Sequence, residues 1–513
     1  MSDRSRNDRN EQERGGAAAA RPSSLDITTA EMNDLSAQVT ALVTDYFARI
    51  RELPVFPNTS ADALDDLLPQ ELPLEGASLE RVLDDCRTLI DASRHNGHPR
   101  FFGYVASPST PVGAFADLIS SALNQNVTAW RSAPAAASIE RTVVRWLASL
   151  VRFTEDGGGL LVSGGSMANL IALLIAHRAK AAGDVSREGL WNAGPPMTVY
   201  ASDQVHLSIP KGADVLGLGR DQVRIVRSDE RFRLDVRDLR ERLESDTRAH
   251  MRPFCVVSSA GTVNTGAVDP LLEIGRVARA YELWSHVDGA YGAPAALDQS
   301  KRVLFEGIEQ ADSLSLDAHK WLYAPLDCGC LLFRDPARAR AAFSEGEADY
   351  IKVQEEAEAE AFAFWDYGVE LSRRFRALKV WMMLRYYGTR HVASAITEDN
   401  ALASYFAKRV READDFELLA PVELSICCFR YVPPRLRVQL RSANEDERAS
   451  INAVLNQLNA RIVHSVQRSG RAYLSNAMLR GTYALRACIT NFRTRREDID
   501  QTLDIVREAA REY

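Results

Sequence analysis

Strand-like apolar runs alternate with helix-like runs through the middle of the chain. The apolar runs cover residues 160–163, 198–202, 254–258, 283–287 and 313–316. Alternation of this kind predicts an α/β fold, in which a mostly parallel sheet carries helices on both faces. Ligands of such sheets collect at the carboxyl ends of the strands, so we expect the functional residues there.

The flanking regions follow other patterns. Residues 1–30 cannot bury enough apolar area to offset chain entropy, so we expect a disordered tail. Apolar spacing predicts helices from Thr28 and over 79–92, which lack a core of their own and should pack on another domain or subunit. Beyond the tail, we expect an N-terminal helical segment, a large domain and a small C-terminal α/β domain. Their predicted ranges are 31–115, 116–385 and 386–513.

Composition narrows the class of protein. The chain of 513 residues carries 62 lysines and arginines against 70 aspartates and glutamates, so no basic surface predicts nucleic-acid binding. Seven scattered cysteines without a Cys-x-x-Cys pair support neither a zinc site nor a disulfide framework. No apolar run has the length of a membrane span, and the N-terminus is polar. We therefore expect a cytoplasmic enzyme without metal or membrane contact.

A lysine closes the last apolar run of the predicted sheet, in the sequence Asp317-Ala318-His319-Lys320-Trp321. Burial disfavours a charged amine, so desolvation should lower the pKa of Lys320 and leave a nucleophile for an aldehyde cofactor. A lysine taken alone is more often a solvated surface group. The motifs upstream favour the functional interpretation.

The run Ser163-Gly164-Gly165-Ser166 leads from a strand directly into a helix. Free backbone N–H groups and the helix dipole favour a phosphate at such a turn. A tight turn without a ligand has the same pattern. No Gly-Lys-Ser/Thr follows, so this is not the P-loop of nucleotide-binding proteins.

Two further polar residues follow predicted strands. Asp288 comes just after the run 283–287, where a buried carboxylate needs a partner such as the pyridine nitrogen of pyridoxal phosphate. His206 follows the run 198–202 and is placed to lie flat against the same ring. The alternatives are a helix N-cap or a structural ion pair for Asp288, and an ordinary core or surface histidine for His206.

Together these motifs resemble those of the group II pyridoxal-phosphate-dependent amino acid decarboxylases, and most of all their aromatic branch. The resemblance covers residues from about 95 to 500. It rests on His98-Pro99, Ser163-Gly164-Gly165-Ser166, Asp203-Gln204-Val205-His206, His286-Val287-Asp288-Gly289-Ala290-Tyr291, His319-Lys320-Trp321 and Ser372-Arg373-Arg374-Phe375-Arg376. It implies the fold-type I architecture with a seven-stranded sheet, pyridoxal 5'-phosphate as cofactor, and α-decarboxylation of an L-amino acid to the amine and CO2.

The resemblance also implies a role for each residue of the cofactor site. Lys320 forms the covalent link to the cofactor, and Asp288 pairs with the pyridine nitrogen. His206 stacks on one face of the ring, and Ala290 lies against the other face.

The remaining cofactor contacts follow from the same resemblance. Gly165 and Ser166 hold the phosphate, and His319 and Thr262 lie beside the cofactor. Asp317 departs from the asparagine that the family often has at this position, which leaves the contacts on that side open.

The proton that replaces the lost carboxyl group commonly comes, in this family, from a tyrosine on a loop. The run Asp349-Tyr350-Ile351-Lys352 is similar to the corresponding run of the aromatic enzymes, so Tyr350 is the predicted acid. Tyr367 is the weaker alternative. A tyrosine in this place favours the amine, whereas a phenylalanine would favour oxidative formation of an aldehyde.

The substrate pocket is less well defined by the resemblance. Its predicted residues are Phe102, Tyr104, Asn126 and Thr128. This mixture of aromatic and polar side chains allows an aromatic amino acid without requiring one. The resemblance further implies a homodimer with the site at the subunit interface.

Several alternative functions stay open at this point. An aldehyde synthase would share every cofactor residue, and a decarboxylase of diaminobutyrate or glutamate would differ in the substrate pocket. An aminotransferase or a cysteine desulfurase-like lyase would share the fold. A catalytically inactive scaffold derived from a decarboxylase is the non-enzymatic alternative.

Overall fold

The computed structural model describes residues 25–67, 71–154, 156–192, 194–343 and 361–513. By their internal contacts they form two compact units. The first comprises the described residues within Met1–Ile50 and Thr59–Ala92, and the second comprises those within Arg51–Asn58 and Ser93–Tyr513. The first 24 residues of the predicted disordered tail lie outside the described residues.

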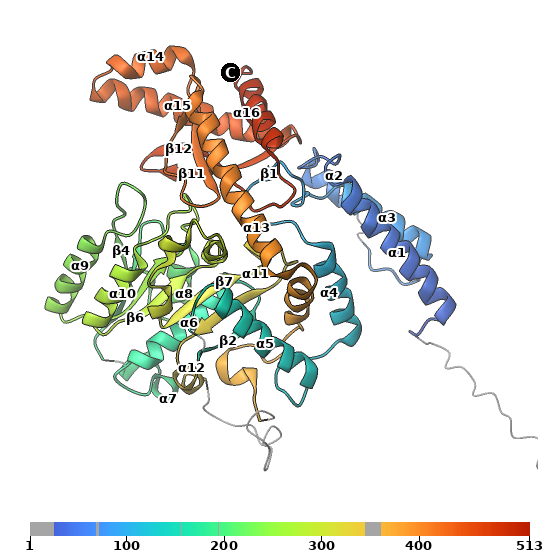
Figure 1. Cartoon of the computed structure of the whole chain (residues 1–513), viewed down its shortest axis with the longest axis horizontal. Coiled ribbons are helices and arrows are strands. Elements are labelled where there is room, and N and C mark those ends of the chain that lie inside the picture. The colour runs from blue at the N-terminus through green and yellow to red at the C-terminus, as the bar shows by residue number, and fades with distance from the viewer. Residues whose placement is uncertain (1–24, 68–70, 155, 193, 344–360) are drawn as a thin grey trace, which may run out of the picture. The chain divides into compact units, whose positions relative to one another are not determined.

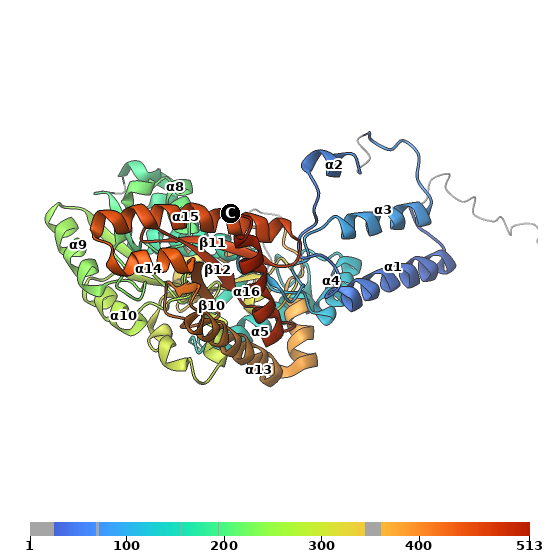
Figure 2. The same ribbon diagram turned by 90° about the horizontal axis from the view of Figure 1, so that it is seen from above.

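The first unit contains the helices α1 (Thr29–Arg49), α2 (Ala61–Asp65) and α3 (Leu79–Asp91). The two long helices, which the sequence pattern predicted, lie side by side within this unit (Figure 2). α1 begins with a capping box, in which the Thr28 side chain accepts from the Glu31 N–H and the Glu31 carboxylate accepts from the Thr28 N–H. No residue of α1 is buried, and Leu83 is the buried residue of α3.

The second unit is built on a seven-stranded sheet with the strand order β2-β8-β7-β6-β5-β3-β4. The strands are β2 (Gly158–Val162), β3 (Met197–Ser202), β4 (Val223–Val226), β5 (Arg252–Ser259), β6 (Trp284–Asp288), β7 (Ser313–Asp317) and β8 (Gly329–Phe333). β8 runs antiparallel to both of its neighbours, and the remaining pairs are parallel. The predicted α/β class with a mostly parallel sheet is confirmed. The sequence pattern missed β4 and β8, because β4 is a four-residue edge strand and no long helix separates β8 from β7.

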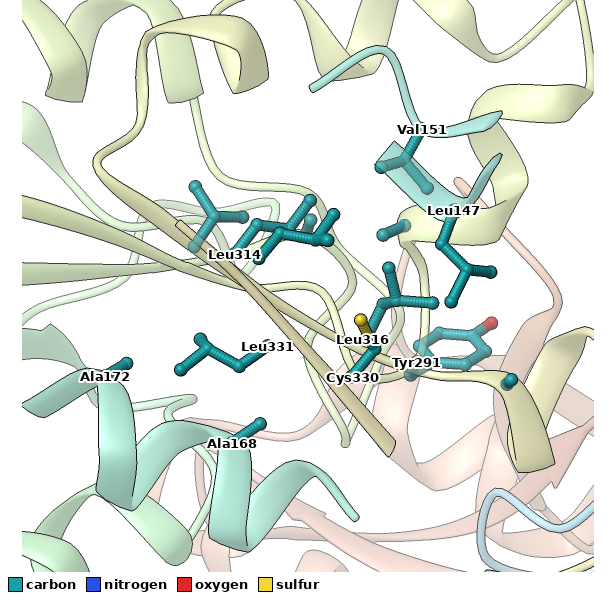
Figure 3. Close-up of a cluster of buried hydrophobic side chains, with 14 of the residues drawn as sticks. Leu147, Val151, Ala168, Ala172, Tyr291, Leu314, Leu316, Cys330 and Leu331 are labelled. Carbon is teal, nitrogen blue, oxygen red and sulfur yellow. The ribbon is translucent and has the colours of Figure 1, made fainter. Parts of the chain in front are cut away.

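Helices cover both faces of this sheet (Figure 1). They are α4 (Pro111–Leu123), α5 (Pro134–Leu150), α6 (Gly165–Lys180), α7 (Val185–Glu188), α8 (Ser208–Val215), α9 (Val236–Arg248), α10 (Leu271–Ala280), α11 (Ala318–Trp321) and α12 (Pro336–Ala341). Side chains alternate across a strand. Leu316 of β7 therefore points to the side of Leu147 in α5, whereas Leu331 of β8 points to the side of Ala168 in α6 (Figure 3). Each large apolar side chain buried in these layers stabilises the fold by about 1.5–3 kcal/mol.

A second sheet in the same unit has the strand order β1-β11-β12-β10-β9. Its strands are β1 (Phe101–Phe102), β9 (Phe416–Leu418), β10 (Ile426–Tyr431), β11 (Tyr473–Leu479) and β12 (Thr482–Cys488), and its helices are α13 (Ala377–Glu412), α14 (Pro434–Ser442), α15 (Glu445–Arg468) and α16 (Arg496–Ala510). β1 pairs parallel with β11, although it comes from the predicted N-terminal segment. α13 runs from the large sheet to the small one (Figure 1) and is kinked at Gly388, where φ is 74°. Because α13 crosses residue 385, a domain boundary at that residue stays a prediction.

None of the helices in the described ranges has the length and apolar composition needed to cross a membrane.

Candidate active site

A cavity of about 530 Å³ opens where β6 and β7 end and α6 begins. Its lining includes Tyr104, Ser163, Gly164, Gly165, Ser166, Asn169, His206, Ser259, Asp288, Ala290, Tyr291, Asp317, His319 and Lys320. The strands bring these residues together because their carboxyl ends meet at one edge of the sheet. Of the predicted cofactor residues, all except Thr262 line this cavity.

Lys320 lies in the short helix α11 directly after β7. Its Nζ is 2.9 Å from Oδ2 of Asp317, whose side chain is almost completely buried. Asp317 Oδ1 is buried and has no hydrogen-bond partner among the described residues, so this carboxylate depends on the lysine. The sequence left the contacts of Asp317 open. In the structure its carboxylate forms an ion pair with Lys320, three residues away.

Asp288 ends β6 and is buried beneath the cavity. Its Oδ1 accepts hydrogen bonds from the Ala290 N–H at 3.1 Å and from the Ser315 hydroxyl at 3.2 Å. Its Oδ2 accepts from Nδ2 of Asn169 at 2.8 Å. All three donors are neutral, and Asp288 forms no ion pair with any described residue. A buried carboxylate in this state suits a cationic ligand group.

His206 follows β3 at the mouth of the cavity, where part of its ring is exposed. Its Nδ1 lies 2.8 Å from the Ser208 hydroxyl and 3.2 Å from the Ser208 backbone nitrogen. Desolvation and the nearby Lys320 charge lower the pKa of His206, while Asp288 opposes the shift. The ring is therefore neutral near pH 7 and presents a flat apolar face.

The turn between β2 and α6 is packed too closely for side chains. A Cβ at Gly165 would lie 2.8 Å from Cβ of Ala290, and a Cβ at Gly329 would lie 2.5 Å from Cα of Gly164. The first N–H groups of a helix have no intrahelical partner. Gly165 and Ser166 therefore present theirs to the cavity, which makes an anion site at the helix N-terminus.

A stack of aromatic rings closes one wall of the cavity. The ring of Tyr291 lies parallel to Trp321, with 5.1 Å between centroids, and its hydroxyl is 2.7 Å from Oγ of Ser425. Asp399 Oδ2 accepts hydrogen bonds from Trp321 Nε1 and from the Tyr323 hydroxyl, both at 2.8 Å. Burial raises the pKa of Asp399 to about 7. The wall is thus tied to α13 and to the start of β10.

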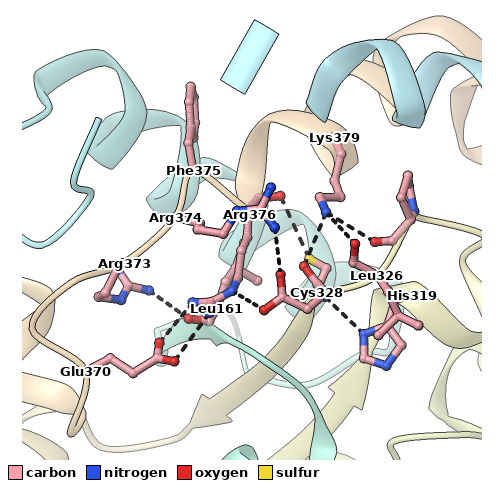
Figure 4. A network of polar contacts seen from close by, with 12 residues as sticks. Leu161, His319, Leu326, Cys328, Glu370, Arg373, Arg374, Phe375, Arg376 and Lys379 are labelled. Carbon is pink, nitrogen blue, oxygen red and sulfur yellow. Dashed lines mark hydrogen bonds and ion pairs between the residues drawn. The ribbon is translucent and has the colours of Figure 1, made fainter. Parts of the chain in front are cut away.

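His319 is held by the turn over residues 325–328 (Figure 4). Its Nδ1 accepts from the Cys328 N–H at 3.0 Å. Lys379 Nζ donates to the carbonyl oxygens of residues 325, 326 and 327, and Arg376 forms an ion pair with Asp327 at 3.0 Å. The lysine and the arginine therefore support the cofactor cavity from behind.

Arg373 forms a buried clamp with Glu140. Arg373 also donates to the carbonyl oxygens of Val127 at 2.6 Å and Leu161 at 2.7 Å, and Glu140 accepts from the Leu161 N–H at 3.0 Å. The clamp fixes the end of β2, one step before the glycine turn. It does not line the cavity.

Some predicted residues lie elsewhere in the described structure. Phe102 is completely buried in the core of the small sheet, where it meets Phe406 edge-on. This is a correction for a residue expected to contact substrate. The hydroxyl of Thr262 lies 2.9 Å from that of Thr265, and Thr262 is absent from the cavity lining.

Asn126 and Thr128 lie beside the segment that precedes α13. Asn126 Oδ1 accepts from the Arg373 N–H at 2.8 Å, and the Thr128 carbonyl accepts from the Phe364 N–H at 2.8 Å. Neither residue lines the Lys320 cavity of its own chain.

The two candidate proton donors differ in what is known of their positions. Tyr367 stacks on Phe333 and lines a separate cavity, so the structure does not bring it to Lys320. Tyr350 lies outside the described residues.

Sequence reasoning missed the side chains that orient Asp288 and His206, namely Asn169, Ser208 and Ser315. One signal for Asn169 was present. It is the sole polar residue in the run from Met167 to Ala176. A buried amide in such a place needs hydrogen-bond partners.

The sequence matches the family model for the pyridoxal-dependent decarboxylase conserved domain over residues 61–432. The chain belongs to the pyridoxal-dependent decarboxylase family. It is 35% identical to an aromatic-L-amino-acid decarboxylase of Bacillus atrophaeus, over 95% of this chain and 97% of that protein. It is 31% identical to a 4-hydroxyphenylacetaldehyde synthase of Rhodiola rosea, over 95% and 96%. The solved structure of Oryza sativa TDC with PLP and tryptamine superposes with a TM-score of 0.86 at 27% identity, over 96% of this chain and 99% of that chain.

The expected family, enzyme class and cofactor are therefore confirmed: this is a pyridoxal-phosphate-dependent amino acid decarboxylase. The cavity fits the cofactor, because Asp288 suits a protonated ring nitrogen, the N-terminus of α6 suits a phosphate and Lys320 suits an aldehyde. When bound, pyridoxal phosphate supplies an electron-accepting ring that favours cleavage of a bond at the substrate α-carbon.

Proposed function

We propose that this decarboxylase converts an aromatic L-amino acid into the corresponding amine and CO2. The observation that carries the proposal is the single cavity in which Lys320 and Asp288 lie beside the aromatic rings of Tyr104 and Tyr291. The aromatic substrate named for the Bacillus relative supports the substrate class.

Four residues of the cavity would bind the cofactor ring and its aldehyde in this proposal: Lys320, Asp288, His206 and Ala290. Lys320 would hold the cofactor through a covalent bond to its aldehyde carbon. Asp288 holds the proton at the ring nitrogen, with its carboxylate oriented by three neutral donors. His206 and Ala290, which line the same cavity, would contact the ring.

The remaining residues would bind the phosphate group or lie beside the cofactor. The N–H groups of Gly165 and Ser166 bind the phosphate, because that end of α6 carries the positive end of the helix dipole. His319 lies against Asp317, with 3.7 Å between Nε2 and Oδ2. Thr262 stays a predicted cofactor residue.

A proton must reach the α-carbon after the carboxyl group leaves. We assign this step to Tyr350, on the resemblance of its surrounding sequence to that of the aromatic enzymes. Tyr367 is the less favoured donor, since it lines another cavity. Delivery of this proton separates amine formation from the oxidative alternative.

The functional enzyme is proposed to be a homodimer. Phe115, Leu118, Ile119 and Leu123 of α4 are exposed at helical spacing, which gives an apolar face for a second copy. Asn126 and Thr128, which follow α4, would then contact the substrate in the partner's cavity. Sedimentation of the purified protein as a monomer would contradict this arrangement.

A cytoplasmic location is also part of the proposal. All seven cysteines are free thiols, and six of them are buried. Proteins that keep their thiols unpaired are typical of reducing compartments.

The test is a release assay for CO2 over phenylalanine, tyrosine, tryptophan and dopa, with glutamate and diaminobutyrate as non-aromatic substrates. We expect CO2 and amine in equal amounts from an aromatic substrate, and neither product from Lys320→Ala. Release from glutamate or diaminobutyrate alone would contradict the aromatic assignment. A keto acid without CO2 would contradict decarboxylation itself.

An aldehyde synthase is the second candidate, because the Rhodiola relative carries that name. That reaction would consume one O2 and one water per substrate and release the aldehyde, CO2, ammonia and hydrogen peroxide. Peroxide equal to CO2 in the wild-type enzyme would establish it. We expect peroxide only from Tyr350→Phe, with Tyr367→Phe as the matched control that still forms the amine.

A further inference from the structure

Asn169 makes three hydrogen bonds beneath the cavity. It lies on α6, one turn past Ser166, and its side chain is almost completely buried. Its Nδ2 is 2.8 Å from Asp288 Oδ2 and 2.8 Å from Ser208 Oγ, and its Oδ1 is 2.9 Å from His286 Nε2. The amide of Asn169 thus connects Asp288 with His286 and with Ser208, the hydrogen-bond partner of His206.

Chemistry fixes the direction of each bond. An ionised carboxylate only accepts hydrogen bonds, so the amide NH2 of Asn169 faces Asp288 and its oxygen faces His286. Burial lowers the pKa of His286 to about 4, so the imidazole is neutral and carries a single N–H. That N–H must be on Nε2, because it donates to the Asn169 oxygen.

The hydrogen-bond network continues beyond His286 to Ser313 and Trp284. His286 Nδ1 accepts from the Ser313 hydroxyl at 2.9 Å. The oxygen of Ser313 in turn accepts from Trp284 Nε1 at 2.9 Å. Every polar side-chain atom of this buried network has a hydrogen-bond partner, and fully satisfied networks of this kind rigidify a site.

In the other direction, the hydrogen-bond network extends from Asn169 through Ser208 to His206. The Ser208 oxygen accepts from Asn169, so the hydroxyl proton of Ser208 is free to point at Nδ1 of His206. The Ser208 backbone N–H points at the same nitrogen. Nδ1 is therefore an acceptor, and a neutral His206 carries its proton on Nε2.

We propose that Asn169 is a positioning residue that couples the two cofactor-facing side chains. Its amide orients the carboxylate of Asp288, and through Ser208 it holds His206 in the tautomer protonated on Nε2. The proposal rests on the roles proposed above for Asp288 and His206. It adds that these two residues are set by one side chain instead of independently.

The first test reads the His206 tautomer in the apoprotein by 15N NMR of histidine-labelled protein. The chain has nine histidines, and His206→Gln assigns the relevant signal. We expect an unprotonated Nδ1 in the wild type. In Asn169→Asp the new carboxylate attracts the Ser208 hydroxyl proton, so we expect a population with the proton on Nδ1.

The second test is the dissociation constant of pyridoxal phosphate, from absorbance titration of the apoprotein. Asn169→Ala removes a hydrogen bond to a charged group, so we expect affinity to fall about tenfold to a hundredfold. Ser208→Ala should change the His206 signal and weaken binding less. Ser120→Ala, which removes a buried hydroxyl donating to the Phe375 carbonyl at 3.3 Å, is the matched control and should change neither.

A protonated Nδ1 in the wild type, or a tautomer and affinity unchanged in both Asn169 variants, would overturn the proposal. If Asn169→Asp does not fold, Asn169→Ala and Ser208→Ala give the same two measurements. The tautomer is read without cofactor or substrate. A failed decarboxylase assay therefore leaves it unaffected, and an unexpected tautomer leaves the proposed reaction unaffected.

Discussion

The buried clamp between Arg373 and Glu140 offers a quantitative test of the architecture. The exposed fraction of the two side chains is 1% and 0%. Glu140→Ala would leave a buried guanidinium without its counter-charge, and Arg373→Met would leave a buried carboxylate held by one N–H. Loss of one partner of such a pair costs about 3–5 kcal/mol, so each variant should lower the free energy of unfolding by about that amount.

The double variant Glu140→Leu/Arg373→Met removes both charges together. It still leaves the carbonyl groups of Val127 and Leu161 without their donor and the Leu161 N–H without its acceptor. The two single variants remove the same partners between them, and each also leaves an unpaired buried charge. We therefore expect the double variant to cost clearly less than the summed cost of the single variants, which is about 6–10 kcal/mol.

The assay is urea unfolding of the apoprotein, followed by tryptophan fluorescence and evaluated by linear extrapolation. Arg471→Met is the control, because it breaks an ion pair with Glu508 in which both side chains are about half exposed. Exposed pairs contribute about 0–1 kcal/mol. Single variants as stable as this control, or a double variant equal to their sum, would refute the argument.

Three further predictions concern the site and its wall. Lys320→Ala should lack the visible absorbance of bound cofactor and the borohydride-fixed adduct; a retained adduct would assign the covalent bond to another residue. Gly165→Val should weaken cofactor binding at least tenfold, because its Cβ would lie 2.8 Å from that of Ala290. Gly76→Val is the control and should bind the cofactor normally, because a Cβ there has no atom within 4 Å. Equal dissociation constants for the two variants would argue against the phosphate turn. Asp399 binds its proton more tightly in the folded state, with a pKa raised from 3.8 to about 7, so its contribution to stability is lost as pH rises across that interval. Asp399→Asn should therefore reduce the fall in melting temperature between about pH 5 and about pH 8, and an unchanged fall would contradict the raised pKa.

The sequence was most informative where polar residues follow buried strands. Asp288, His206 and Lys320 each come after an apolar run, and parallel strands bring such positions to one edge of the sheet. Their meeting at a single cavity could therefore be predicted without a structure. The glycine turn before Ser166 was predictable for the same reason.

Side chains that act across elements were not predictable in this way. Asn169 lies on a helix and meets Asp288 from another element, so no local spacing records the contact. Phe102 and Tyr104 were both expected at the substrate pocket, on the family resemblance alone. The strand ends at Phe102, and Tyr104 has a φ of 55°, so the chain turns and sends the two rings to different places.

The stacked rings of Tyr291 and Trp321 make the cofactor itself a reporter on distant packing. The Tyr291 ring borders the cavity, while its hydroxyl is hydrogen-bonded to Ser425, directly before strand β10 of the small sheet. Loosening of the small sheet should therefore appear first as a changed colour or fluorescence of the bound coenzyme, before any loss of overall folding. Titrating the holoenzyme with mild denaturant would show whether the spectral change of the coenzyme occurs at a lower denaturant concentration than global unfolding.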